Sequence, residues 1–319
     1  MVSGNGKQGG TMPTNANIGI LVPGAFAGNP PTLDEYSQFF RSTEELGFHS
    51  LWVIDRVFHG INIVDPLLLL TCAATVTSRV RLGTAVYLFV LRNPVLAAKT
   101  IATLDYLSAG RVTLGISLGG RDNEFEPLGV SMKRRVSRFE EGLALMRQLF
   151  TEKDVTFHGR HFNVDNVNVD PKPVQKPGLP IIMGGSADAA LKRSAELGDG
   201  WVAGGTSSPE LFGEAWQKVR GYAQAAGKNP DCLESAKLIY VNVGDDRQKC
   251  KEELEAFTHA YYGPQYDVEN FCAFGSAADC AAKIQPYIDA GAKTMMLGPA
   301  WPDVAQITHI AQGVLPLLK

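Results

Sequence analysis

Apolar and polar residues alternate along the chain with two different periods. Eight short runs rich in Val, Ile and Leu have the continuous apolar character that is typical of strands covered on both faces. These runs are 18–23, 50–55, 80–86, 111–120, 179–185, 199–205, 236–244 and 292–299. The longer segments between them carry apolar residues at helical spacing. In the first such segment, Thr32 and Glu35 predict the start of a helix and Gly47 predicts its end.

The alternation predicts the fold class. Eight strand–helix units over about 300 residues fit one (β/α)₈ (TIM) barrel, and a doubly wound open sheet is the alternative. An insertion breaks the rhythm after the long helix expected at 132–150. There VTFHGRHFNV, 155–164, predicts a hairpin, and the Pro-rich stretch up to strand 179–185 predicts an extended crossing. Residues 1–16 are expected to form a disordered tail, and 17–319 a single domain.

The composition argues against nucleic-acid and membrane partners and indicates a cytoplasmic protein. The formal net charge is −3 and there is no long basic run, so neither nucleic acid nor an anionic membrane is an expected partner. Five scattered cysteines, with no C-x-x-C, indicate reduced thiols in the cytoplasm. No apolar stretch reaches the roughly 18 residues that span a bilayer. The first residues also lack the apolar core of a secretory signal.

The strand ends carry the candidate chemistry, because the active sites of such barrels lie there. The six histidines form no H-x-H or H-E-x-x-H, so no metal site is expected. Gly184, Gly185 and Ser186 stand directly before a predicted helix, where free N–H groups suit a phosphate. A tight turn in which Ser186 caps that helix is the alternative interpretation.

A second strand end adds small residues and hydrogen-bond donors at Gly119, Gly120, Arg121 and Asn123. Near it, the strand 80–86 stays apolar through 87–91 instead of turning into a polar loop. This extension is expected to wall a pocket or to be buried in a dimer contact. Together these features predict a pocket for a large, flat, phosphorylated ligand that itself carries the chemistry.

Motifs spread over about 17–300 point to a family. They include LGFHSLWVIDR (46–56), NPVLAAKTIATLDYLSAGRVTLGISLGG (93–120) and KPVQKPGLPIIMGGSADAALKRSAELGDGW (172–201). The combination of TLDYLSAGR with the later GDGW is specific. The sequence resembles the bacterial luciferase-like monooxygenases. The resemblance implies a (β/α)₈ barrel that binds reduced flavin or the deazaflavin F420 at the C-terminal strand ends.

The resemblance also implies finer features. A non-prolyl cis peptide is expected between Ala85 and Val86, forming a bulge against the cofactor ring. Leu118 occupies about the place where luciferase has an arginine for the flavin phosphate, and Arg121 is the candidate replacement. Many F420 members have Asp-His after strand two, where this chain has Asp55-Arg56. Family members often form homodimers, commonly through helices two and three.

Three functions follow from the resemblance. The leading one is a monooxygenase that takes reduced FMN from a separate reductase and inserts oxygen into a small organic substrate. An F420-dependent oxidoreductase, served by an F420 reductase, is the alternative. A non-catalytic flavin-binding barrel is the third, because no clear acid–base pair is evident. The candidate catalytic residues are Asp55 and His59, although His59 equally fits a solvated loop.

Several further charged and aromatic side chains have simpler interpretations. Glu124 is expected to be a solvated charge at the start of a helix, and Trp52 and Trp201 are expected to be core residues. The run RRVSRFEE is expected to form a solvated helix face, and the alternative is that Arg134 or Arg135 reaches a phosphate or a polyglutamate tail.

Overall fold

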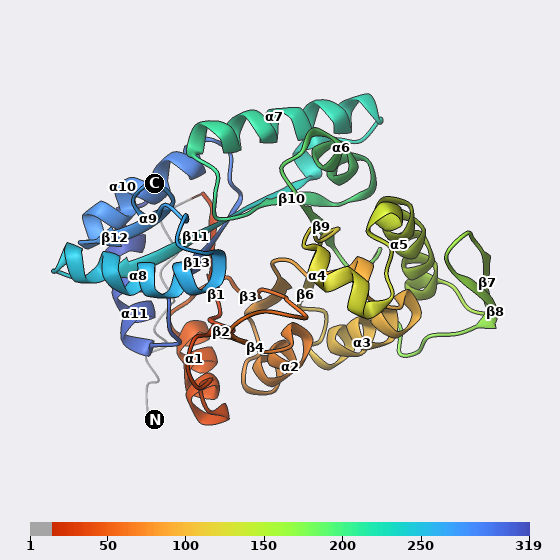
Figure 1. Ribbon diagram of the computed structural model, residues 1–319, viewed down its shortest axis with the longest axis horizontal. Helices are drawn as coiled ribbons and strands as arrows, with labels where there is room; N and C mark the ends of the chain where they lie inside the picture. The colour runs from red at the N-terminus through yellow and green to blue at the C-terminus, as the bar shows by residue number, and fades with distance from the viewer. Residues whose placement is uncertain (1–14) are drawn as a thin grey trace, which may run out of the picture.

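A computed structural model describes residues 15–319, and the first 14 residues of the predicted disordered tail lie outside this range (Figure 1). Eight parallel strands follow one another around a closed barrel, and the last pairs with the first. They are β1 (Asn17–Leu21), β3 (Ser50–Val53), β5 (Arg81–Thr84), β6 (Val112–Ile116), β9 (Ile181–Gly184), β10 (Gly200–Ala203), β11 (Glu234–Val243) and β13 (Thr294–Gly298). The (β/α)₈ barrel is therefore confirmed, and the open sheet is excluded.

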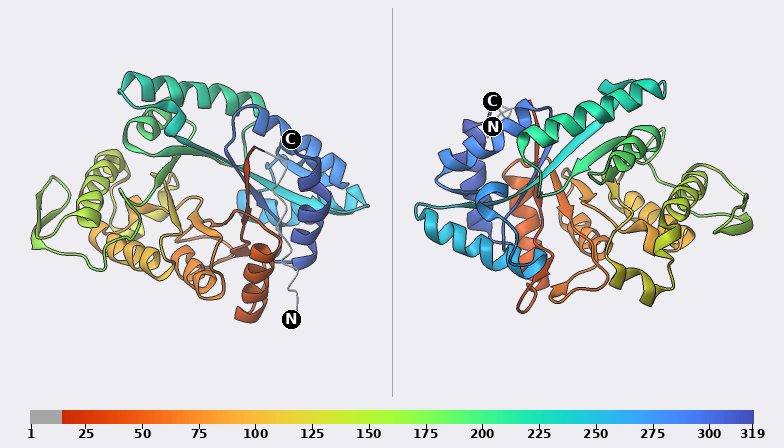
Figure 2. Two further views of the ribbon diagram at one scale, coloured as in Figure 1. Left: turned by 180° about the vertical axis from the view of Figure 1, so that it is seen from behind. Right: turned by 45° about the horizontal axis from the view of Figure 1, so that its top comes forward.

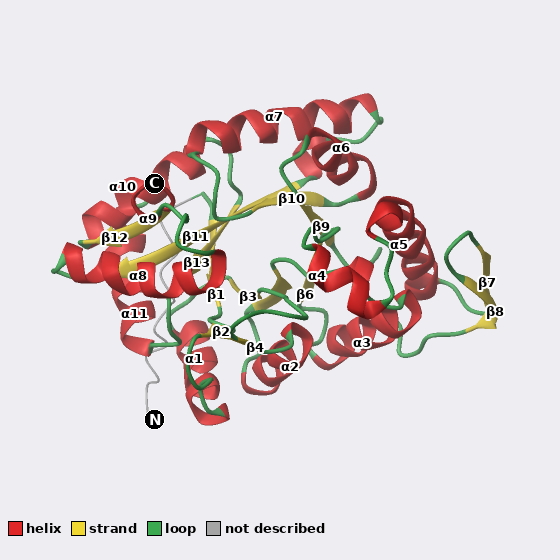
Figure 3. Ribbon diagram, viewed as in Figure 1, coloured by secondary structure: helices red, strands yellow, loops and turns green. Residues whose placement is uncertain are grey.

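Helices surround the barrel (Figure 3). They are α1 (Leu33–Glu45), α2 (Pro66–Val76), α3 (Pro94–Leu107), α4 (Asp122–Phe125), α5 (Arg135–Thr151), α6 (Asp188–Leu197), α7 (Pro209–Ala225), α8 (Arg247–Tyr262), α9 (Val268–Phe271), α10 (Ala277–Asp289) and α11 (Val304–His309). The predicted capping box at Thr32 and Glu35 is present, and Gly47 follows α1 with φ of 84°. No helix among residues 15–319 is long and apolar enough to cross a membrane.

Residues 15–319 include three short strands outside the barrel that the sequence pattern did not predict. Strands β2 (Ala25–Phe26) and β4 (Asn62–Ile63) form an antiparallel ribbon. Strand β12 (Cys272–Gly275) pairs with the last four residues of β11, while the first part of β11 pairs with β10 and β13. The ten-residue β11 therefore runs well beyond the barrel rim.

The predicted insertion is a hairpin of β7 (Val155–His158) and β8 (Asn163–Val167). It projects from one end of the molecule, beyond α5 (Figure 2). Glu141 of α5 anchors its turn, because its carboxylate accepts hydrogen bonds from the N–H groups of residues 160, 161 and 162. The hairpin is thus fixed to the barrel through one helix.

The apolar run 87–91 is buried within this single chain, with every residue at most 6% exposed. It folds into a short 3₁₀ turn at Phe89–Leu91. The ring of Phe89 packs edge-to-face on Phe139 of α5, with 5.9 Å between centroids. Leu88 alone of the run lines a cavity. The run is therefore mainly core beneath α5, and its burial does not require a dimer.

Candidate active site

A cavity of about 890 Å³ opens at the C-terminal ends of the barrel strands. This volume lies within the usual range for small-molecule sites. Its floor is apolar and is formed by residues that follow or belong to different strands: Ile54, Ala85, Val86, Leu238 and Met296. The predicted location of the site is thus matched by the main hollow of the barrel.

The peptide bond between Ala85 and Val86 is cis, as expected from the family resemblance. Both residues line the cavity. Gly184, at the end of β9, leaves room for this bulge. A Cβ on Gly184 would lie only 3.2 Å from a methyl group of Val86. The contact of this bulge with a cofactor ring remains a prediction.

Gly184, Gly185 and Ser186 also line the cavity, immediately before α6. The prediction that Ser186 caps α6 is wrong. Gly185 has φ of 139°, and the chain continues one residue further, so that Ala187 takes the N-cap position without a side-chain hydrogen bond. The first N–H groups of α6 therefore lack a side-chain cap at the edge of the cavity, which is favourable for an anion.

The residues after β6 divide between the cavity and the surface. Gly119, Gly120 and Arg121 line the cavity, and a Cβ on Gly120 would meet nothing within 4 Å. Asn123 is exposed and is not part of the lining. Arg121 therefore lines the cavity, and its contact with a cofactor phosphate remains a prediction.

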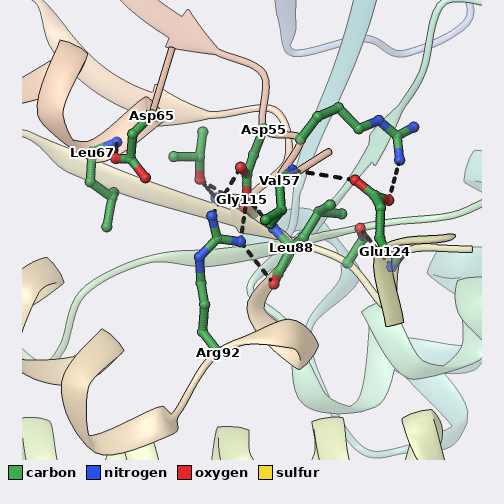
Figure 4. A network of polar contacts seen from close by, with 12 residues as sticks. Asp55, Val57, Asp65, Leu67, Leu88, Arg92, Gly115 and Glu124 are labelled. Carbon is green, nitrogen blue, oxygen red and sulfur yellow. Dashed lines mark hydrogen bonds and ion pairs between the residues drawn. The ribbon is translucent and has the colours of Figure 1, made fainter. Parts of the chain in front are cut away.

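Asp55 is buried at the end of β3 and forms a two-pronged ion pair with Arg92 (Figure 4). Its Oδ2 accepts from Arg92 Nη1 at 2.6 Å and from the Leu88 N–H at 2.8 Å, and its Oδ1 accepts from Arg92 Nη2 at 3.0 Å. Burial raises the pKa of Asp55, and the Arg92 guanidinium opposes that rise. Three donors occupy the carboxylate, so it ties β3 to the segment that follows the cis bond.

The prediction that Glu124 is a solvated charge is wrong, because its side chain is fully buried. Oε2 accepts from Arg56 Nη1 at 2.9 Å, and Oε1 accepts from the Val57 N–H at 3.3 Å (Figure 4). The short helix α4 directs this carboxylate back over the chain that leaves β3. Arg56 is therefore held in place with its Nε buried and unbonded in the described chain.

His59 lies behind the cavity wall and does not line it. Its ring stacks on Tyr261, with centroids 5.0 Å apart. Nδ1 accepts from the Ile61 N–H, so Nε2 carries the proton and donates to the Tyr261 carbonyl at 3.0 Å. Burial lowers the pKa of His59, which keeps the ring neutral at pH 7. Nε2 and the stacked ring therefore position Tyr261, whereas Nδ1 holds the loop at Ile61.

Sequence reasoning missed several lining residues. Tyr261 and Tyr262 end α8 and face the cavity, and the Tyr262 hydroxyl lies 2.9 Å from that of Tyr240. Ser207 also lines it, from the loop after β10. The stretch around the two tyrosines has a high aromatic content but no motif that points to a binding site. No feature of the sequence marks Ser207 as a binding residue. Trp201 is buried as expected, yet it borders the cavity and donates to the Gly185 carbonyl at 2.8 Å.

Two features of the lining fit a polar, anionic ligand. Arg56 Nε and Ser207 Oγ are buried atoms without a hydrogen-bond partner among residues 15–319. Unpaired buried polar groups are uncommon in native proteins unless a ligand or water meets them. In addition, Arg121, Arg135 and Lys218 line the cavity besides the paired Arg56. Two acidic side chains also line it, Glu214 and the paired Asp55.

Comparison with known proteins decides the family, because the model for "Luciferase-like monooxygenase" matches residues 12–266. The chain belongs to this family. Luciferase-like relatives include an F420-dependent glucose-6-phosphate dehydrogenase of Kineococcus radiotolerans, 27% identical over 89% of this chain and 92% of the relative. A 5,10-methylenetetrahydromethanopterin reductase of Archaeoglobus fulgidus is 29% identical over 68% of this chain and 63% of the relative.

Solved structures share the luciferase-like fold. An F420-dependent secondary alcohol dehydrogenase, in complex with an F420–acetone adduct, aligns with a TM-score of 0.84 and 23% identity over 95% of this chain and 99% of that one. The oxygenating constituent of 3,6-diketocamphane monooxygenase from Pseudomonas putida, in complex with FMN, aligns with a TM-score of 0.80 and 18% identity over the same shares. The protein is an oxidoreductase of a family that contains both F420-dependent enzymes and flavin monooxygenases.

Proposed function

We propose that the protein is an F420-dependent oxidoreductase that moves a hydride between the deazaflavin and a small organic substrate. The observation that carries this proposal is the set of three cationic side chains along the cavity, Arg121, Arg135 and Lys218. Neither arginine forms an ion pair within residues 15–319, and Lys218 has only a long contact of 3.7 Å with Asp188. F420 ends in a phosphate and a polyglutamate tail, whereas FMN ends in one phosphate.

Relatives support the same choice and reverse the preference for FMN drawn from the sequence. Two curated relatives named as F420-dependent glucose-6-phosphate dehydrogenases match this chain over 89% and 91% of its length. The sugar-phosphate substrate is not carried over, because Gly120 stands where such members place an acid after strand four.

Three groups of residues would hold the cofactor. Ala85 and Val86 would support one face of the ring. Gly184, Gly185 and Ser186, with the uncapped start of α6, would hold the phosphate. The Ser207 hydroxyl would add a hydrogen bond, and Arg121 and Arg135 would meet the tail, with Gly119 allowing close approach of the backbone.

Bound F420 supplies a ring position that accepts or donates a hydride, and the protein supplies the rest. The apolar floor of Ile54, Leu238 and Met296 excludes water from the reacting atoms. Burial raises the pKa of Tyr262, so its phenol keeps its proton at neutral pH. Because Tyr240 shares a hydrogen bond with it, Tyr262 is the candidate group that exchanges a proton with a substrate oxygen. His59 and Asp55 then position the site rather than react.

A reduced-FMN monooxygenase is the second candidate, and one observation favours it. Many F420 members have histidine after the aspartate that ends strand two, and this chain has Arg56 there. Arg56 is paired with Glu124 and stays protonated, so it cannot act as a proton donor at neutral pH. In this function the same apolar floor protects an oxygen-transfer step from water.

Titration of the purified protein tests the choice. F420 is expected to bind with micromolar affinity, and a deazaflavin without phosphate and tail at least tenfold more weakly. Arg135→Gln is expected to reduce this difference, whereas Arg160→Gln on the distant hairpin is not. Binding of reduced FMN with no binding of F420 would reject the proposal. Binding of either cofactor without turnover on any substrate tried would indicate the non-catalytic barrel.

The expectations for domain organisation, cellular location, reductase partner and oligomeric state remain proposals. We infer that 17–319 act as one domain in the cytoplasm, with a separate F420 reductase that supplies the reduced cofactor. We also propose a homodimer through α2 and α3. These helices expose large apolar side chains, namely Leu68, Leu96, Tyr106 and Leu107.

A further inference from the structure

We propose that a second cavity, separate from the cofactor site, binds an organic ammonium ion with an apolar body. This cavity has a volume of about 800 Å³. Its lining residues come mainly from the start of α1, from α8 and from the loop that joins β13 to α11, and Figure 1 labels these helices and this strand. It shares no lining residue with the cavity at the barrel mouth.

Aromatic rings form one part of its wall. Phe26 and Trp301 pack edge-to-face with centroids 5.1 Å apart, and Phe257 of α8 also lines the cavity. Trp301 is 45% exposed although it is among the largest apolar side chains of the protein. Aromatic faces attract cations through the ring quadrupole, by about 0.5–2 kcal/mol for each well-placed ring. The wall therefore suits a cation better than a neutral ligand of the same shape.

The charge of the lining has a single sign. Glu35, Glu253 and Asp303 line the cavity, and no lysine or arginine does. Hydrogen bonds from Thr32 lower the pKa of Glu35, so it is ionised at neutral pH. Asp303 uses Oδ1 to cap α11, which leaves Oδ2 for another donor. This acidic lining excludes phosphorylated ligands, including the proposed cofactor.

An amide oxygen in the same lining has no donor within the described chain. Asn242 is 4% exposed, and its Nδ2 donates to the Cys250 carbonyl at 3.1 Å and to Glu253 Oε2 at 2.7 Å. Both partners are acceptors, so the amide orientation is fixed. Oδ1 is then left without a hydrogen bond from any of residues 15–319. Because Asn242 lines the cavity and Oδ1 is not among the fully buried unpaired atoms, an N–H donor bound in the cavity can pair with it.

These three observations define the ligand class. A primary or secondary ammonium group offers N–H donors to Asn242 Oδ1 and a positive charge to Glu253 and Asp303. Its apolar body would lie against Phe26 and Trp301. A quaternary ammonium would match the charge and the rings, but it has no hydrogen for Asn242.

The test uses the full-length protein and two probes of one shape. The first probe is 2-phenylethylamine, which is cationic at pH 7.5, and the second is 2-phenylethanol, which replaces the ammonium by a hydroxyl. Calorimetric titration is expected to show saturable one-to-one binding of the amine, at least tenfold tighter than the alcohol. Equal affinity for both probes, or no saturable binding of the amine, would overturn the proposal.

Substitutions then locate the binding. Glu253→Gln combined with Asp303→Asn keeps the helix cap and is expected to weaken amine binding about tenfold, and Trp301→Leu about fivefold. The matched control is Glu252→Gln, one residue along α8 and outside the cavity, which is expected to change nothing. An affinity that survives the cavity substitutions would place the amine elsewhere and reject the site. F420 affinity is measured in the same variants and is expected to stay constant, so this test is independent of the cofactor assignment.

Discussion

Lys237 donates a hydrogen bond from Nζ to the carbonyl oxygen of Gly204 at 2.6 Å, although its side chain is fully buried. It lies on the face of β11 opposite to Leu238, which lines the cavity at the barrel mouth. Tyr266 and Tyr287 donate in the same way to the carbonyls of Gly205 and Ser207, at 3.1 and 2.8 Å. Three side chains from outside the cavity thus fix the loop 204–207 that borders it.

Replacement of this lysine is expected to affect ligand binding. Lys237→Met keeps the length of the side chain and removes the bond to Gly204, so the loop that presents Ser207 loses an anchor. We expect F420 affinity to fall by up to about tenfold, since the net contribution of a hydrogen bond is about 0.5–1.5 kcal/mol. Lys228→Met is the control, because Lys228 binds carbonyls at the far end of α6. Unchanged F420 affinity in Lys237→Met would show that the loop does not need this anchor.

Lys237 also predicts a dependence of stability on pH. Burial lowers the pKa of Lys237 to about 7, whereas a lysine in an unfolded chain has a pKa of about 10.4. Between these values the unfolded chain binds more protons, so this residue makes the free energy of unfolding rise with pH. The neighbouring Cys272 and Tyr287 have their pKa raised by burial to about 12, so they stay neutral below about pH 8.5.

The measurement compares the free energies of unfolding of wild type and Lys237→Met between about pH 6 and 8.5. The difference, wild type minus variant, is expected to grow as the pH rises above 7. A difference that stays constant with pH would mean that Lys237 keeps its charge when buried.

The pair of Asp55 and Arg92 predicts a large effect on stability. Asp55→Ala leaves the partly buried guanidinium of Arg92 without its carboxylate partner and frees the Leu88 N–H. Breaking a buried pair in this way costs about 3–5 kcal/mol. Chemical denaturation measures the loss. The control is Asp165→Ala, which removes an exposed partner of His158 on the hairpin and is expected to change stability little. Similar losses in both variants would contradict the anchoring role of Asp55.

Gly120 offers a clean test of an anionic ligand at the barrel mouth. It lines the cavity and has open space where a Cβ would point, so a side chain fits without strain. Gly120→Asp adds a negative charge and is expected to weaken F420 binding at least tenfold, while Gly120→Ala is expected to have little effect. Equal effects of both variants would point to volume rather than charge. Gly185 is less suitable, because a Cβ there would lie 2.7 Å from that of Ala190.

The proposed dimer predicts a change of mass in solution. Leu68 of α2 and Leu96 of α3 are each 69% exposed in the single chain. Leu68→Glu with Leu96→Glu is expected to convert a dimer into a monomer in light scattering after gel filtration. Leu317→Glu, at an exposed apolar position near the C-terminus, is the control. A dimer that survives the double substitution would exclude this face.

Local patterns were sufficient to predict the barrel strands, the main helices and the inserted hairpin, because each depends on periodicity within a short stretch. The burial of Glu124 could not be predicted, since its partner Arg56 is 68 residues away and only the closed barrel brings them together. Strand β12 was missed for a similar reason. Its four residues pair only because β11 continues past the rim.

The length of β11 has a consequence for the layout of the molecule. Alternate residues on one face of this strand line different cavities: Leu238 borders the cavity at the barrel mouth, and Asn242 borders the second one. Tyr240 stands between them, with its hydroxyl on Tyr262 and its ring 5.3 Å from Phe257. Tyr240 therefore lies between two cavities whose linings favour ligands of opposite charge. The strand β11 contributes residues to both cavities.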